Sequence, residues 1–313
     1  MSDNAMTASA QTPELYPGAT AMEEDRLRPG CEAHKIAFCR MLLDTHNPYK
    51  PAIIDWPQLD DTARDRLVSL PIWDIAVQTE GKASIRVMSY AEMLSDPLLR
   101  EAVMLNGFEE KRHKNVLANM VAAYGIKLAP EPPYLRPKHP RWAFFVTGLS
   151  ECIDSFFAFG LFAVARQSQF FPPELIETFE PVMQEEARHI LFFVNWMAWH
   201  QRNLSWPRRL FFWGVIGLAW IRLVRERIGL ARGVGASKDE TPQDNNFTLT
   251  GSKAVSDIDI SPGALLDLCL AENERRMAGY DPRLLRPQAV PRMVRFVRRF
   301  MRARPKPAAA GTA

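Results

Sequence analysis

A five-residue pattern, Glu-Glu-x-Arg-His, occurs twice in otherwise apolar stretches of the chain. The copies are EEKRH at residues 109–113 and EEARH at residues 185–189. In an α-helix, residues three positions apart lie on one face, about 4.5 Å apart along the axis, so each copy presents a glutamate and a histidine together. On an inward helix face this pair needs a compensating partner, and a metal ion is such a partner.

Two further glutamates stand where a second pair of helices would supply them. A dinuclear carboxylate site in a four-helix bundle takes a glutamate and a histidine from each of two helices, and one glutamate from each of the other two. Glu80 precedes Glu110 by 30 residues and Glu151 precedes Glu186 by 35 residues, each among apolar or small residues. The repeated order predicts one metal site on four helices. Solvated surface salt bridges are the alternative interpretation.

Four long helices are expected to position these residues. Their expected bounds are 69–94, 97–124, 140–167 and 173–202. Ser69 is the predicted N-cap of the first helix, with Pro71 in its first turn, and Pro181 is expected to kink the fourth. Short connections make each neighbouring pair antiparallel, whereas the middle connection of about fifteen residues can reach roughly 45–50 Å. The expected fold class is all-α, with two antiparallel hairpins joined by a long crossover.

The remaining sequence lies on either side of this bundle. The predicted division of the chain is 1–68, 69–205 and 206–313. The first part is expected to be largely disordered, with short helices near 31–43 and 60–67. The last part is predicted to hold extra helices, a polar linker at 233–260 and a basic amphipathic helix at its end. Residues 271–277 (AENERRM) are interpreted as an exposed helix face.

Composition and charge narrow the class of protein. Hydrophobic residues make up 47% of the 313 residues and charged residues 24%, values typical of a soluble globular protein. The net charge of +3, with arginines concentrated near the C-terminus, gives no indication of nucleic-acid binding. The four cysteines form no CxxC pair, and the N-terminal residues lack the basic and apolar regions of a signal peptide. A cytoplasmic location is therefore expected.

The doubled motif with its two extra glutamates resembles the ferritin-like carboxylate-bridged di-iron oxidoreductases. These include the soluble multicomponent monooxygenases, the acyl-carrier-protein desaturases and the ribonucleotide reductase small subunit, which share a (D/E)ExRH motif on the second and fourth helices. The resemblance covers about residues 70–202. It implies a ferritin-like four-helix bundle, with extra helices at both ends, that holds two iron ions. A manganese–iron pair fits the same ligand types.

The resemblance also implies roles for individual side chains. The implied iron ligands are Glu80, Glu110, His113, Glu151, Glu186 and His189. Glu109 and Glu185 would each orient the histidine of the opposite motif, with Arg112 and Arg188 completing the network. Such supports are expected because a ligating imidazole needs its other N–H held and a buried carboxylate needs a cation.

At several motif positions this chain has a different residue from the known subfamilies. Ser155 stands where the multicomponent monooxygenases have a threonine, four residues after the third-helix glutamate, and is the predicted catalytic hydroxyl. Leu117 replaces the radical tyrosine of the reductase small subunit, and Asp154 replaces the threonine of the desaturases. Val182 stands where the arylamine N-oxygenases add a histidine. No subfamily is matched cleanly.

The resemblance implies an O₂-dependent di-iron oxidoreductase: a hydroxylase, a monooxygenase or a desaturase of a hydrophobic, lipid-like substrate. No flavin- or nicotinamide-binding glycine motif is present, so a separate ferredoxin or flavoprotein reductase is the expected electron donor. One alternative is a ferritin-like iron-handling or peroxide-scavenging protein without an organic substrate. Another is a bundle that keeps the ligands but works as a partner subunit.

Other residues near the motifs carry weaker signals. Four aromatic residues recur at near-helical spacing from the ligand positions and suggest an apolar chamber, with ordinary core packing as the alternative. They are Phe144, Phe162, Phe193 and Trp196. The remaining histidines are interpreted as structural or surface residues: His34, His46, His139 and His200.

Two segments outside the bundle predict contact with a membrane surface. Residues 206–225 carry Trp206, Trp213 and Trp220 at seven-residue intervals around an apolar run that is shorter than the roughly twenty residues needed to span a bilayer. Residues 291–306 form a basic amphipathic pattern. A peripheral position on the inner membrane face follows. A homodimer formed through the tryptophan stripe and a solvated basic tail are the alternatives.

Overall fold

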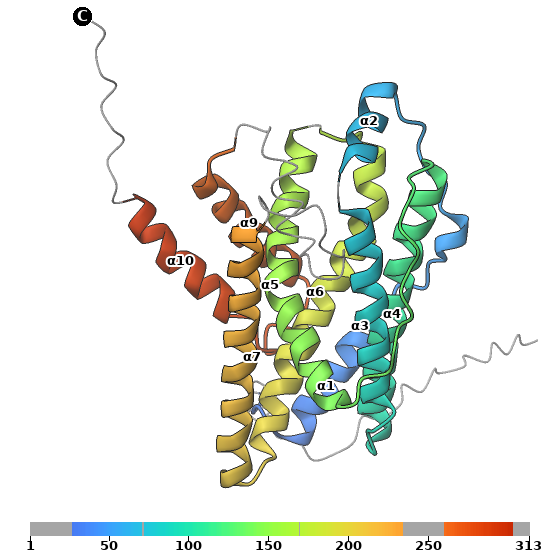
Figure 1. Ribbon diagram of the computed structural model, residues 1–313. Coiled ribbons are helices and arrows are strands. Elements are labelled where there is room, and N and C mark those ends of the chain that lie inside the picture. The colour runs from blue at the N-terminus through green and yellow to red at the C-terminus, as the bar shows by residue number, and fades with distance from the viewer. Residues whose placement is uncertain (1–26, 71, 169, 234–259, 303–313) are drawn as a thin grey trace, which may run out of the picture.

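The described part of the chain is all-helical, as the sequence predicts (Figure 1). This computed structural model describes residues 27–70, 72–168, 170–233 and 260–302. The expected disorder before residue 27, Pro71, most of the polar linker and the end of the basic tail lie outside these residues, as do the side chains of residues 226–233.

Four long helices form the centre of the molecule. They are α3 (Trp73–Ala91), α4 (Pro97–Ala123), α5 (Pro140–Gln167) and α6 (Pro173–Arg202). Local signals fix their ends: the Asp96 side chain accepts from the Leu99 amide at 2.9 Å, and Gly125 follows α4 with a positive φ of 68° that glycine adopts without strain. Pro181 lies within α6, which continues through it.

The start of the first long helix differs from the sequence expectation. Ser69 is not its N-cap but the last residue of α2 (Asp61–Ser69), which Asp60 caps by accepting from the Ala63 amide at 2.7 Å. Helix α3 begins at Trp73, whose indole N–H donates to the Leu67 carbonyl at 2.8 Å. The tertiary contact of a tryptophan outweighs the capping preference of a serine here.

The four helices pack as two hairpins. Helix α3 contacts α4 and α5, and α6 contacts α5 and α4. In Figure 1, α4 and α5 run opposite to α3 and α6, and the extended segment between α4 and α5 returns along the length of the bundle. Contacts hold this segment in place: the Asp74 carboxylate accepts from the Ala129 amide at 2.9 Å, and Lys114 pairs with Glu131 at 2.6 Å.

Shorter helices cover the four. Helix α1 (Glu32–Asp44) contacts α4 and α6, followed by the short helix η1 (Pro51–Ile53). Helix α7 (Trp206–Gly233) contacts α5 and α6, α9 (Pro262–Met277) contacts the same two helices, and α10 (Ala289–Arg302) contacts α9 and α5. The interpretation of residues 271–277 as an exposed face is wrong, because Glu272, Asn273 and Arg276 are buried where α9 packs on the bundle.

Helix α5 lies at the centre of these contacts. It is the one helix among the described residues that is long and apolar enough to cross a membrane by composition, with a mean hydropathy of 1.4. Half of that apolar window is buried inside the molecule, between α3, α6, α7 and α9. A helix enclosed on several sides needs apolar residues all round, so its composition follows from its position in the core.

Candidate metal centre

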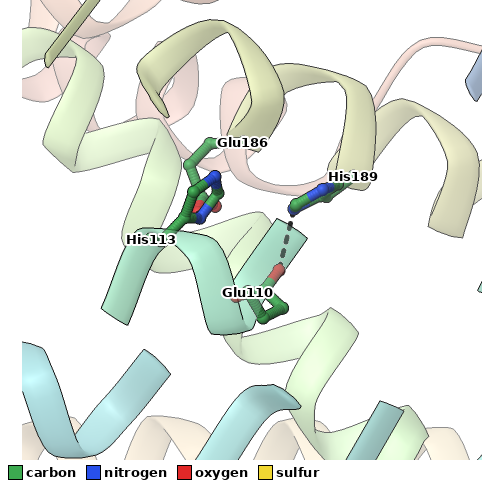
Figure 2. A group of neighbouring side chains, drawn as sticks. All are labelled: Glu110, His113, Glu186 and His189. Atoms are coloured by element: carbon green, nitrogen blue, oxygen red, sulfur yellow. Dashed lines mark ion pairs between the residues drawn. The ribbon is translucent and has the colours of Figure 1, made fainter. Parts of the chain in front are cut away.

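A buried group of two glutamates and two histidines lies between α4 and α6 (Figure 2). Glu110 and His113 come from α4, and Glu186 and His189 come from α6. One potential ligand atom from each lies within 4.8 Å of those of the other three. Each histidine faces the glutamate of the opposite helix: His189 Nδ1 is 2.8 Å from Glu110 Oε1, and His113 Nδ1 is 3.1 Å from Glu186 Oε1. This group can hold a metal ion.

The two remaining predicted ligands reach the same place from α3 and α5. Glu80 Oε2 lies 3.7 Å from His113 Nδ1, and this side chain is 22% exposed. Glu151 Oε1 is buried and accepts no hydrogen bond. Glu80 thus lies beside the group of four, and Glu151 is near enough to interact electrostatically with Glu110, Glu186 and His189.

Burial and neighbouring carboxylates raise the pKa values of Glu110 and Glu151. Burial raises the pKa of Glu110 well above its ordinary value, and the carboxylates of Glu186 and Glu80 raise it further. Burial does the same to Glu151, with Glu110 and Glu186 adding to it. A cation among these groups would relieve the repulsion that these shifts express.

Other contacts favour the charged forms of Glu186 and His113. Burial would raise the pKa of Glu186, but hydrogen bonding and charge from His113, charge from His189 and a hydrogen bond from Ser155 lower it. Burial would lower the pKa of His113, but hydrogen bonds with Glu185, Glu186 and Glu80 raise it well above its ordinary value.

Unpartnered polar atoms test whether a metal fits. Glu110 Oε1, Glu151 Oε1, His113 Nδ1 and His189 Nδ1 are all buried and form no well-aligned hydrogen bond, although His189 Nδ1 lies 2.8 Å from Glu110 Oε1 and His113 Nδ1 lies 3.1 Å from Glu186 Oε1. Buried polar atoms in proteins are nearly always paired, so four such atoms on residues that converge on one site require an explanation. Carboxylate oxygens and imidazole nitrogens are the ligand types that iron and manganese accept. The residues present therefore fit a metal centre.

Two further glutamates hold the histidines in place. Glu109 accepts from His189 Nε2 at 2.8 Å and from Arg188, whose Nη2 is 2.7 Å from both carboxylate oxygens. Glu185 accepts from His113 Nε2 at 2.8 Å. Each histidine is thus oriented by the glutamate of the opposite motif, which is the arrangement that the resemblance implies.

This support also fixes the orientation of each histidine ring. Because Nε2 donates to a carboxylate, Nδ1 is the nitrogen that faces the other candidate ligands, and it would offer a lone pair to a metal ion after losing its proton. The pKa of Glu109 is held far below its ordinary value: burial opposes this, but hydrogen bonding and charge from His189, charge from Arg188 and a hydrogen bond from His46 outweigh it. Glu109 therefore stays ionised and keeps accepting the His189 proton.

The chain between α1 and η1 packs against these supporting residues, a contact that no sequence pattern predicts. We call residues 45–49 the strap. Arg188 Nη1 donates to the Thr45 carbonyl at 2.9 Å, and Arg112 Nη1 donates to the Asn47 carbonyl at 2.6 Å. Arg112 also bonds Glu185 through Nη2. Each motif arginine thus joins a buried glutamate to the strap.

Two strap side chains contact the same glutamates. His46 Nδ1 lies 2.6 Å from Glu109 Oε1, and the Tyr49 hydroxyl donates to Glu185 Oε2 at 3.4 Å. Burial raises the pKa of Tyr49 to about 12, so the phenol keeps the proton that it donates. The placement of His46 with structural or surface residues therefore needs correction, because it contacts the glutamate that orients His189.

The predicted catalytic hydroxyl lies beside a candidate ligand. Ser155, one turn after Glu151 on α5, donates to Glu186 Oε2 at 2.9 Å. Core packing, the other interpretation of the aromatic residues, is confirmed for three of them, because Phe144, Phe193 and Trp196 contact one another with ring centroids 4.8 to 5.8 Å apart. The ring of Phe162 lies apart from them, with the Arg276 guanidinium 5.6 Å from its centroid.

We expect the strap to contribute to metal affinity. Replacing His46 by alanine removes a hydrogen bond to Glu109, and loss of such an outer contact typically weakens metal binding 10- to 100-fold, so a tenfold loss is expected. The measurement is Fe(II) competition against a chelator of known affinity. His139→Ala, which removes an exposed histidine, is the matched control. Equal affinity for His46→Ala and wild type would show that the strap does not support the centre.

Comparison with known proteins adds no relative. No family model matches the chain, and neither the curated proteins nor the solved structures gave a match. The site is therefore interpreted from its own residues and geometry.

Proposed function

We propose that this chain is a ferritin-like di-iron protein that acts as an O₂-dependent oxidoreductase on a hydrophobic substrate. The observation that carries the proposal is the pair of His113 and His189. Each is held at Nε2 by a buried glutamate and turns Nδ1 toward the carboxylate of a candidate ligand on the opposite helix. The hairpin pairing and the long return between α4 and α5 support the ferritin-like assignment.

Charge balance favours two metal ions rather than one. The six candidate ligands include four glutamates, Glu80, Glu110, Glu151 and Glu186, and two histidines that are neutral when they ligate. Two divalent cations neutralise four carboxylates, whereas one would leave a net negative charge in a largely buried site, which is costly. The mixture of carboxylate and imidazole suits iron or manganese.

The chemistry divides between the metal and the chain. Two ferrous ions, held by the candidate ligands, would supply the electrons for a reaction with O₂. The chain orients His113 and His189 through Glu185 and Glu109, and its packed helices limit the access of water. Ser155 is proposed to hold Glu186 and to keep a hydroxyl proton beside it. The four-residue spacing between Glu151 and Ser155 supports the comparison with the multicomponent monooxygenases.

The experiment is a single-turnover reaction with O₂. Protein purified anaerobically and loaded with Fe(II) is exposed to a pulse of O₂ while near-ultraviolet absorbance, O₂ uptake and iron per chain are followed. We expect two irons per chain, O₂ uptake in proportion to iron, and an absorbance change that a chemical reductant resets for a second cycle.

Other results would point to another function. Iron that accumulates well beyond two ions per chain would indicate an iron store. An absorbance change after addition of peroxide, with no change after O₂, would indicate a peroxide scavenger. If the chain bound no metal, the remaining interpretation would be a helical bundle that acts as the partner subunit of another protein. A spectrum unchanged by O₂ at two irons per chain would contradict the proposal.

A further inference from the structure

Helix α10 presents its apolar side to solvent. Met293, Phe296, Val297 and Phe300 are between 43% and 61% exposed. The Phe296 and Phe300 rings contact each other, with centroids 4.9 Å apart. An amphipathic helix of a soluble protein normally buries this side against the core.

Two arginines and two valines attach α10 to the rest of the protein. Arg295 donates to Glu274 of α9 at 2.8 Å, and Arg298 donates to Asp267 of α9 at 2.9 Å. Val290 and Val294 are the residues of α10 that add apolar burial at this contact. Specific ion pairs thus hold the helix with its two phenylalanines directed outward, so their exposure follows from how α10 is attached.

Helix α7 has a second exposed apolar surface. One side of it is buried against the bundle through Phe212, Ile216, Ala219 and Leu223. The opposite side includes six large apolar residues that are 50% to 75% exposed: Trp206, Leu210, Phe211, Trp213, Leu218 and Ile221. Contiguous exposed apolar surface of this kind marks an interaction site.

The two helices lie on the same flank of the molecule. Both contact α5, and Figure 1 places both on the side of the bundle away from α4. We call the exposed apolar faces of α7 and α10 the apolar flank. Its residues are Met293, Phe296, Val297 and Phe300 on α10 and Trp206, Leu210, Phe211, Trp213, Leu218 and Ile221 on α7. A single partner can therefore contact both helices at once.

The two segments that carry the apolar flank, residues 206–225 and 289–302, contain arginines but no aspartate or glutamate. Asp267 and Glu274 of α9 lie beside α10 and pair with Arg298 and Arg295. Five arginines of the two segments are exposed and form no ion pair with any described residue: Arg208, Arg222, Arg225, Arg292 and Arg299. A partner that covers this surface must accept large apolar side chains and supply negative charge beside them.

We propose that the apolar flank binds the surface of an anionic lipid bilayer, with α7 and α10 lying in its interface. Aromatic side chains partition into the boundary between headgroups and acyl chains, and arginines beside them pair with lipid phosphates. The apolar run of α7 is bracketed by Arg208, Arg209 and Arg222, so the proposed helix lies on the bilayer rather than across it.

A second copy of this chain fits the same surface less well. A two-fold dimer would place identical patches together, so the arginines of one copy would face those of the other. Residues 206–225 and 289–302 contain no carboxylate that could pair with the arginines of the other copy. Nothing in the lipid proposal depends on a metal in the buried site.

The test is cosedimentation of the full chain with vesicles. Vesicles of phosphatidylcholine mixed with phosphatidylglycerol are compared with vesicles of phosphatidylcholine alone. We expect binding to the mixed vesicles that weakens as salt screens the arginines. The double variant Phe296→Ser/Phe300→Ser should bind at least tenfold more weakly, because it removes two large apolar side chains that would be buried in the bilayer.

Controls separate lipid binding from loss of folding and from self-association. Met93→Ser/Leu135→Ser removes two exposed apolar residues elsewhere on the surface and should bind as wild type does. Thermal unfolding of the Phe296→Ser/Phe300→Ser variant should match wild type, because the altered side chains are exposed. Equal binding of that variant to mixed vesicles would overturn the proposal. A lipid-free dimer that this variant dissociates, with no vesicle binding by wild type, would assign the flank to a second copy instead.

Discussion

Replacing Glu110 by glutamine is expected to have opposite effects on the metal-loaded and the metal-free protein. With Fe(II) present, the variant should lose bound metal, because a neutral amide replaces a carboxylate at the centre of the candidate ligand set. Without metal, it should be as stable as wild type or more stable. The reason is that burial and the carboxylates of Glu186 and Glu80 disfavour the charged form of Glu110.

Two measurements check this change of sign. Iron per chain is counted after removal of excess metal, and the free energy of unfolding is measured with and without Fe(II). At a metal concentration 100 times the dissociation constant, wild type should gain about 2.7 kcal/mol, and the variant almost nothing. Glu101→Gln, an exposed change on the same helix, is the matched control. A Glu110→Gln variant that is destabilised without metal and still binds iron would show that Glu110 is a structural residue.

Replacing Arg188 by methionine is expected to destabilise the metal-free protein by about 3–5 kcal/mol, the usual effect of leaving one partner of a buried ion pair uncompensated. The Arg188 side chain is 3% exposed and lies 2.7 Å from both oxygens of Glu109, which is fully buried. Urea unfolding of wild type and variant measures the loss. Methionine keeps similar packing volume, so the loss reports mainly on charge and hydrogen bonds.

A surface pair and a second substitution serve as controls. Arg136→Met breaks the ion pair with Glu92, whose side chains are 67% and 43% exposed, and should cost less than about 1 kcal/mol. Adding Glu109→Gln to Arg188→Met should recover part of the lost stability, because it removes the buried charge left without its arginine. If Arg188→Met cost no more than Arg136→Met, the buried network would not stabilise the fold as described.

The sequence predicted the long helices and the grouping of Glu110, His113, Glu186 and His189 because both depend on local signals. Proline and glycine at helix ends set the bounds of α4, α5 and α6, and three-residue spacing places Glu110 with His113 on one face whatever surrounds them. The start of α3 was predicted wrongly because a tertiary contact of Trp73 decides it.

The strap and the orientation of α10 depend on contacts distant in sequence. Tyr49 reaches Glu185 across 136 positions and His46 reaches Glu109 across 63, and no spacing rule relates such residues. The amphipathic pattern of α10 was visible in the sequence, but pairing of Arg295 and Arg298 with α9 decides that its apolar side faces out. Ser155 was placed by resemblance, and its contact with Glu186 gives that placement a physical role to test.

The most direct test of the central claim is an iron-edge anomalous difference map from crystals of the Fe(II)-loaded protein. We predict two peaks within the group of six residues, within ligand distance of His113 Nδ1 and His189 Nδ1. Two peaks there would establish the dinuclear centre and the residues that hold it. Crystals whose iron lies elsewhere, or that show no peak between α4 and α6, would contradict it.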